Sequence, residues 1–90
     1  MLVLPVALTH GDAVACLRML EQSVRAQSTA DVVADAAPLQ RFDSSALAVL
    51  LACRREALHL QKTFAVKGMP DRLRDLAVLY GVAELLPPAV

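Results

Sequence analysis

Aromatic residues are scarce in this sequence, which contains two Phe, one Tyr and no Trp in 90 residues. Because 57% of the residues are nevertheless hydrophobic, the core must consist mainly of closely packed Leu, Val and Ala side chains. A chain of this length lies near the lower end of the sizes that fold on one hydrophobic core. We therefore expect residues 1–90 to form a single domain.

The sequence also has no excess of charge of either sign, because nine Lys and Arg residues balance nine Asp and Glu residues. The positive residues form no basic block. Non-specific nucleic-acid binding and polybasic membrane anchoring both need clustered Lys and Arg. No apolar run approaches the roughly 20 residues of a membrane-spanning helix. The opening "MLVLPVAL" lacks the basic start of an export signal and is interrupted by Pro5. We expect a cytoplasmic protein with no nucleic-acid partner and no direct membrane insertion.

The sequence contains only two cysteines, Cys16 and Cys53, which form no Cys-x-x-Cys pair. Isolated thiols in apolar helical segments are typical of small buried hydrophobic residues rather than of redox or metal sites. The sequence also lacks clustered metal ligands and a Gly-rich phosphate loop. We therefore expect no metal and no cofactor.

Three segments have the composition of β-strands: residues 2–10, 30–37 and 62–68. Pro5 cannot donate a ladder hydrogen bond, which predicts an edge, a bulge or a strand end at that position. In the third segment, Phe64 and Val66 alternate with polar residues and should share one face. We expect a loop from Pro38 to Asp43.

Helical periodicity marks the segments between and after these strands. In residues 11–27 the apolar positions Val14, Leu17, Leu20 and Val24 predict the buried face of an amphipathic helix. The next helix, residues 44–60, is apolar on every side as far as Cys53, so we expect that half to be buried all round. A third helix should begin near Pro70 and end before a left-handed cap at Gly81.

The alternating order of strands and helices predicts an α/β fold with a mixed, mainly parallel sheet of about four strands and right-handed crossovers. Ligands and partners of such sheets are found where strands end and helices begin. The polar triplet Asp43-Ser44-Ser45 lies at such a junction, directly before the most apolar helix.

The triplet has two interpretations. As a purely structural feature, it caps the helix, because Asp and Ser oxygens accept hydrogen bonds from unpaired N–H groups of the first turn. As a functional feature, the Ser44 hydroxyl is an accessible anchor for a partner protein. Phosphorylation there would add negative charge beside Asp43 and could switch an interface off.

Catalysis by Ser44 is a third alternative, which requires a base within hydrogen-bond reach. His59 would lie about 22 Å from Ser44 along one helix at 1.5 Å per residue. His10 at the end of the first strand is the other histidine, and no Gly-x-Ser-x-Gly elbow occurs. We therefore expect that the protein is not an enzyme.

Several segments together resemble STAS domains, the family of sulfate-transporter and anti-sigma-factor-antagonist domains. "FDSSALAVLLACRR" resembles the family's Asp-Ser/Thr signature at the start of a helix, and "VALTHGDA" resembles the end of its first strand. The tail "LRDLAVLYGVAELL" is similar to that of the small cytoplasmic STAS subunit of Mla-type phospholipid-transport ABC systems. Two departures are the short N-terminal strand region and Ala46, where Gly is more common. The shortened region could leave a sheet edge uncovered.

The resemblance implies a STAS-like α/β fold and a non-catalytic accessory subunit. Its partner would be the nucleotide-binding subunit of a phospholipid-transport ABC transporter, which would hold it at the inner membrane from the cytoplasm. It implies contact through Asp43, Ser44 and Ser45, with Phe42, Arg54 and Arg55 flanking. A solvated helix face is the alternative for the two arginines.

Two further alternatives concern regulation and assembly. The chain could instead be an anti-sigma-factor antagonist phosphorylated on Ser44, and a homodimer formed through an uncovered strand edge also stays open. We interpret Tyr80 as a residue at the edge of the core rather than at an interface.

Overall fold

A computed structural model describes residues 1–89 and contains five short strands and three α-helices. In chain order they are β1 (Leu2–Val3), β2 (Ala7–Leu8), α1 (Ala13–Ala26), β3 (Asp31–Asp35), β4 (Arg41–Phe42), α2 (Ser45–His59), β5 (Thr63–Lys67) and α3 (Asp71–Leu79). Two 3-10 helices, η1 (His10–Asp12) and η2 (Ala83–Leu85), precede α1 and follow α3. None of the helices in the described chain has the length and apolar character needed to span a bilayer.

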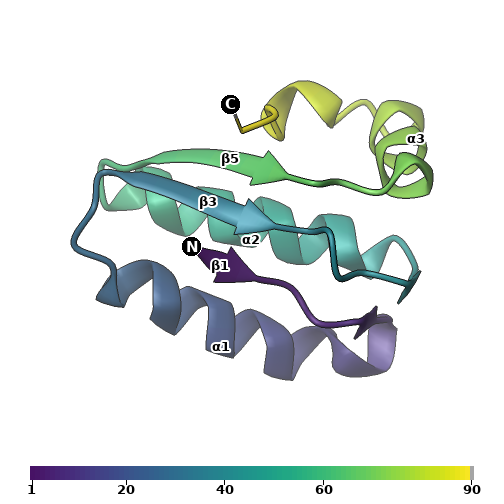
Figure 1. Cartoon of the computed structure of the whole chain (residues 1–90), viewed down its shortest axis with the longest axis horizontal. Helices are drawn as coiled ribbons and strands as arrows, with labels where there is room; N and C mark the ends of the chain where they lie inside the picture. The colour runs from purple at the N-terminus through teal and green to yellow at the C-terminus, as the bar shows by residue number, and fades with distance from the viewer. Residues whose placement is uncertain (90) are drawn as a thin grey trace.

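The strands form a three-stranded sheet in the order β1-β3-β5 and a two-stranded sheet of β2 and β4 (Figure 1). Every pairing between these strands is parallel, and the register places Val32 beside Phe64 and Leu2 beside Ala34. Sequential parallel strands joined by helices confirm the predicted α/β fold.

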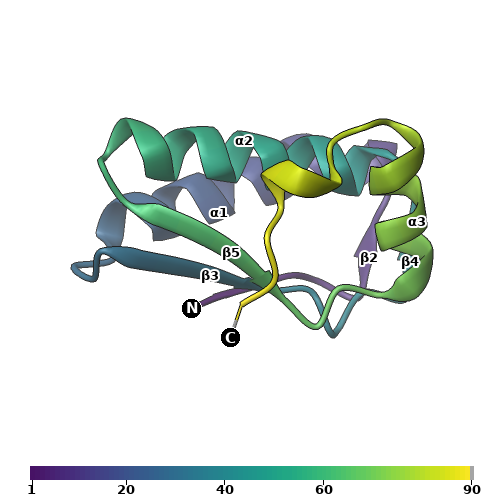
Figure 2. The same cartoon turned by 90° about the horizontal axis from the view of Figure 1, so that it is seen from above.

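Helices α1 and α2 both lie on one face of the larger sheet, and the opposite face carries no helix (Figure 2). Residues at alternate positions of β3 and β5 point toward the helices and are buried: Val32, Ala34, Phe64 and Val66. This alternation confirms that Phe64 and Val66 share a face. On the outer face, Val33 and Ala65 are half-buried and Val3 is 56% exposed.

The expected strand over residues 2–10 is divided at Pro5 into β1 and β2. The Leu4 N–H still donates to the Asp35 carbonyl oxygen at 3.0 Å, but Pro5 has no N–H with which to extend the ladder. The chain then turns toward the second sheet, where β2 pairs with β4. The expectation of an unbroken loop from Pro38 to Asp43 is wrong, because β4 lies within it.

The predicted buried face of α1 is correct except at its first position. Leu20 and Val24 are fully buried, whereas Val14 is 64% exposed. Cys16 takes the inward position near the start of the helix, because the stripe that faces the sheet is rotated away from Val14.

Both thiols belong to the hydrophobic core. Cys16 and Cys53 are free and buried, as expected. Burial raises the pKa of the Cys53 thiol to about 12, so this side chain stays protonated near neutral pH.

The first half of α2 is less buried than expected. Ala46, Val49, Leu50 and Cys53 face the core, but Ala48 is exposed and Leu51 is half-buried. The expectation that this half is covered on every side is therefore wrong along one stripe, and apolar side chains reach the surface there.

The C-terminal segment continues the fold beyond α3. Gly81 has a φ of 72° and ends the helix in the left-handed conformation that the sequence predicts. After η2 the tail returns to the sheet, where Val66 donates to the Pro87 carbonyl and accepts from the Ala89 N–H. The tail thereby pairs with β5 on the side away from β3.

Lys62 joins the end of α1 to the start of β5. Its ammonium group donates to the carbonyl oxygens of Val24, at 3.1 Å, and Gln27. These carbonyls belong to the last turn of α1 and its C-cap, where a positive charge also interacts favourably with the helix dipole.

We expect Lys62→Met to lower the free energy of unfolding by about 1–3 kcal/mol, because it removes charge-assisted hydrogen bonds at a half-buried position. Urea unfolding followed by circular dichroism measures this change. Lys67→Met is the matched control, since Lys67 ends the same strand but is exposed. Equal effects of the two substitutions would contradict the role assigned to Lys62.

Candidate functional site

The Asp43 carboxylate joins the start of α2 to the turn before α1. Its Oδ1 accepts a hydrogen bond from the Ser45 N–H at 2.8 Å, and its Oδ2 accepts one from the His10 N–H at 3.0 Å. Asp43 therefore caps α2 and fixes the position of η1 beside it. One side chain holds together two segments that are far apart in the sequence.

These contacts stabilise the ionised form of the carboxylate. The hydrogen bond from the Ser45 N–H, followed by smaller contributions that include the His10 N–H, lowers the pKa of Asp43 from its ordinary value of 3.8. Asp12, in the adjacent turn, accepts hydrogen bonds from the N–H and the hydroxyl of Thr9. These bonds lower the pKa of Asp12 too. Asp12 and Asp43 are therefore both ionised near neutral pH.

The Ser44 hydroxyl is available to an external group. Ser44 is exposed and precedes the first residue of α2. Its carbonyl oxygen accepts hydrogen bonds from Leu47 and Ala48, but its hydroxyl has no hydrogen-bond partner within residues 1–89. Ser45 is half-buried, so Ser44 is the more accessible of the two hydroxyls.

An apolar groove begins at Ser44, and we call it the Ser44 groove. It has a volume of about 300 Å³ and combines the exposed stripe of α2 with the turn that follows α3. Its lining residues are Ser44, Leu47, Ala48, Leu51, Tyr80 and Val82. The groove therefore presents a hydroxyl group at one end of an otherwise largely apolar surface.

Tyr80 forms one wall of the Ser44 groove and is 59% exposed. The interpretation of Tyr80 as a residue at the edge of the core is therefore wrong. Val78 and Leu79, which precede it, are 63% and 76% exposed. Three consecutive residues of a helix cannot all face the same core, and this apolar run is the signal in the sequence that could have identified the surface.

The three flanking residues do not line the Ser44 groove. Phe42 is half-buried, and the guanidinium carbon of Arg72 lies 4.7 Å from the centre of its ring. Arg54 and Arg55 follow Ser44 on α2 by about 15 Å along the helix axis. Arg54 is half-buried and Arg55 is exposed. The structure thus groups the hydroxyl with apolar side chains rather than with these cations.

Within the described chain, the site has no arrangement typical of hydrolysis or metal binding. His10 contacts Asp43 through its backbone N–H, and no hydrogen bond joins its imidazole to Ser44 in residues 1–89. No cluster of three or more His, Cys, Asp or Glu side chains capable of holding a metal occurs in that part of the chain.

Comparison with known family models finds a match over nearly the whole chain. The family model described as "Mlab, STAS domain" matches residues 2–87, which include every strand and helix described above. A search of curated proteins gives no match.

We expect the stability of Asp43→Asn to differ from that of the unaltered protein in a pH-dependent way. Because folding lowers the pKa of Asp43 below 3.8, the ionised carboxylate stabilises the folded state above that pH. This contribution is lost as the pH falls through the lowered pKa. Urea unfolding between about pH 7 and about pH 2.5 should therefore show a stability difference that shrinks only at the acidic end.

Asp75→Asn controls for the loss of one negative charge, since Asp75 is an exposed residue of α3. If the difference between Asp43→Asn and the unaltered protein stays constant down to about pH 2.5, the capping role of the ionised carboxylate is contradicted.

Proposed function

This chain belongs to the STAS domain family, and from that premise we propose that it is an accessory subunit whose Ser44 groove binds a partner protein. The observation that carries the proposal is the exposed apolar surface beside an unpaired Ser44 hydroxyl. STAS domains generally have regulatory rather than catalytic roles, which agrees with a docking surface at this position.

The composition of the Ser44 groove supports a protein partner. Tyr80 offers a large amphipathic ring, a type of side chain enriched among residues that dominate binding energy. Ala48 and Leu51, which belong to α2, add an apolar stripe to the same groove. Exposed apolar patches rimmed by polar residues mark interaction sites in folded proteins.

We propose that the partner is the cytoplasmic nucleotide-binding subunit of a phospholipid-transport ABC transporter. The family description "Mlab" supports this choice, as does the similarity of residues 73–86 to the end of the small subunit in such systems. The tail includes Tyr80 and Val82, which line the groove. In this role the chain is cytoplasmic and reaches the inner membrane only through its partner.

The second candidate function is that of an anti-sigma-factor antagonist controlled by phosphorylation. The free, exposed hydroxyl of Ser44 at the start of a long helix favours it, since that position is accessible to a kinase. A phosphate there would stand beside the Asp43 carboxylate, so the added negative charge would oppose binding of an apolar or acidic partner. A mass increase of one phosphate after mixing with an anti-sigma kinase distinguishes this candidate.

We expect Tyr80→Ala to weaken binding to the ATPase subunit by about 30-fold, which corresponds to about 2 kcal/mol. Ser44→Glu should weaken it further, because it places a charge at the apolar groove. Ser44→Ala should change the free energy of unfolding by less than about 0.5 kcal/mol, since the hydroxyl makes no internal hydrogen bond. Calorimetric titration of purified ATPase and thermal unfolding measure the two quantities.

Val14→Ala is the matched control, because Val14 is an exposed apolar residue on α1 and does not line the groove. Copurification of the unaltered chain with the ATPase is the expected starting point. The proposal is wrong if Tyr80→Ala and Ser44→Glu bind as tightly as the unaltered chain.

A further inference from the structure

A second surface, at the β1 edge of the sheet, is independent of the Ser44 groove. We propose that β1 pairs antiparallel with β1 of a second copy of this chain, so that two three-stranded sheets join across a twofold axis at Val3. Unpaired backbone groups and largely uncharged side chains at this edge support the pairing.

The backbone of Val3 faces away from its own sheet. Leu4 donates to Asp35 on β3, and the groups of a parallel strand alternate between its two sides. The N–H and C=O of Val3 therefore point outward, where no strand of the described residues pairs with them. Two copies related by a twofold axis would exchange two identical hydrogen bonds, each from a Val3 N–H to the other Val3 carbonyl.

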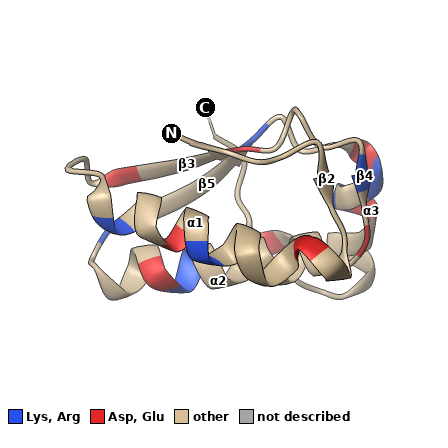
Figure 3. Ribbon diagram, turned by 90° about the horizontal axis from the view of Figure 1, so that it is seen from below, with Lys and Arg blue, Asp and Glu red and all other residues tan. Residues whose placement is uncertain are grey.

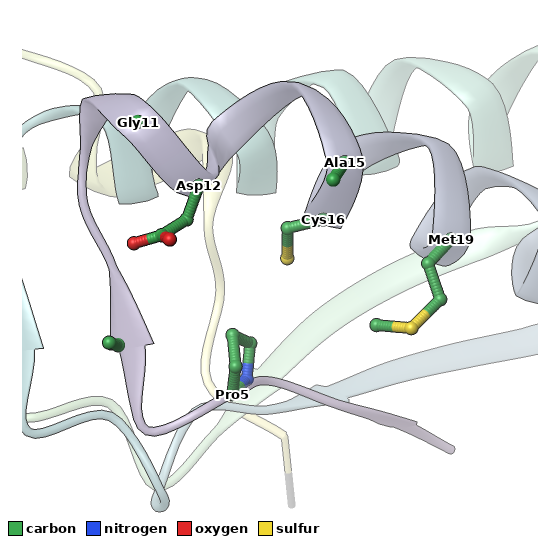
Figure 4. Close-up of a pocket in the computed structure, with 7 residues that line it drawn as sticks. Pro5, Gly11, Asp12, Ala15, Cys16 and Met19 are labelled. Atoms are coloured by element: carbon green, nitrogen blue, oxygen red, sulfur yellow. The ribbon is translucent and has the colours of Figure 1, made fainter.

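Apolar side chains flank this edge on both sides. On the outer face of the sheet, Val3 and Met1 are 56% and 64% exposed. On the helix side, a hollow of about 360 Å³ separates the chain at Pro5 from α1. Figure 4 shows Cys16 and Met19 extending from α1 toward Pro5 across this hollow. Met19 is 52% exposed, so the hollow carries an apolar side chain available for contact.

The lack of charge identifies a second copy as the occupant. Residues 1–9 include no Lys, Arg, Asp or Glu. Figure 3 accordingly draws the chain in tan from the N-terminus through β2. In the hollow, only Asp12 is charged, at the end nearest η1. Apart from the Met1 amino group and Asp12, the groups at this edge are uncharged. An apolar partner therefore fits the edge better than a charged one, and a second copy supplies such a surface.

The same pairing brings the two α1 helices together. Ala15 and Met19 lie on the side of α1 that lines the hollow, and the small Ala15 side chain allows close approach of two helices. The contact is limited in length, because Pro5 supplies no N–H beyond Leu4. A contact limited to this short strand should give association that depends on protein concentration rather than an obligate dimer.

The two surfaces have no lining residue in common, because the residues around the hollow at Pro5 differ from those of the Ser44 groove. β1 and β5 form the two edges of the sheet, and α3, which carries Tyr80 at its end, lies beyond β5 (Figure 1). A dimer through β1 would therefore leave both Ser44 grooves free. The test of dimerisation can therefore fail while the proposed partner binding holds, and the reverse is equally possible.

Analytical ultracentrifugation of the full chain between about 1 and about 500 µM tests the proposal. We expect the mass to rise with concentration from 9.6 kDa toward twice that value. Val3→Pro deletes the outward N–H and leaves the hydrogen bonds to β3 intact, as edge strands tolerate. It should weaken dimerisation about tenfold or more, the effect of losing two hydrogen bonds.

Met19→Lys places a charge beside the axis and should weaken dimerisation at least as much, which guards against a folding defect in Val3→Pro. Val14→Lys is the control, because Val14 lies about 140° around α1 from Met19 at 100° per residue and is also exposed to solvent. Thermal unfolding verifies that each variant is folded. A monomer throughout the concentration range would overturn the proposal. So would a dimer unaffected by Val3→Pro and Met19→Lys, or one weakened equally by Val14→Lys.

Discussion

The structure depends on the burial of one face of a parallel sheet by two helices. Because β1, β3 and β5 follow the same order in the sheet as in the chain, right-handed crossovers place α1 and α2 on the same side. Parallel sheets are usually covered on both faces. Within residues 1–89, no helix covers the second face. The apolar side chains left at the surface therefore follow from the topology rather than from local defects.

The polar junction at Asp43 joins a structural contact to the proposed binding surface. The carboxylate is engaged by the N–H groups of Ser45 and His10, so it cannot turn freely toward a partner. The neighbouring Ser44 hydroxyl has no such engagement within the described residues. Because Asp43 caps the helix, the Ser44 hydroxyl is left free for the partner contact that we propose.

Much of the fold could be predicted from the sequence because the signals were local. Alternation around Phe64 and Val66 identifies β5, and Gly81 identifies the end of α3, since each depends only on neighbouring residues. The two-residue strand β4 was missed because it is too short to show a period. Val14 was placed in the core because helical spacing gives the width of an apolar stripe but not its rotation, which is set by packing against the sheet.

The candidate site was predictable only in its polar part. Asp43 and Ser44 follow from the chemistry of helix starts, together with the resemblance to a family. The contribution of Tyr80 depends on how the turn after α3 packs beside α2, and that is a tertiary contact with no counterpart in sequence spacing. Phe42, Arg54 and Arg55 are close to the triplet in sequence, yet the helix rise and the fold direct them elsewhere.

The C-terminal tail has a consequence for how far strand pairing can propagate. Two residues of β5, Phe64 and Val66, have backbone groups that face away from β3. Val66 is already hydrogen-bonded to Pro87 and Ala89 of the tail. A single unoccupied position is too short to template another strand, so the described chain can be extended from the β1 side alone. Molecules with one sheet edge that can pair form closed dimers, whereas molecules with two such edges can form fibres. By occupying Val66, the tail blocks the β5 edge against pairing with a further strand.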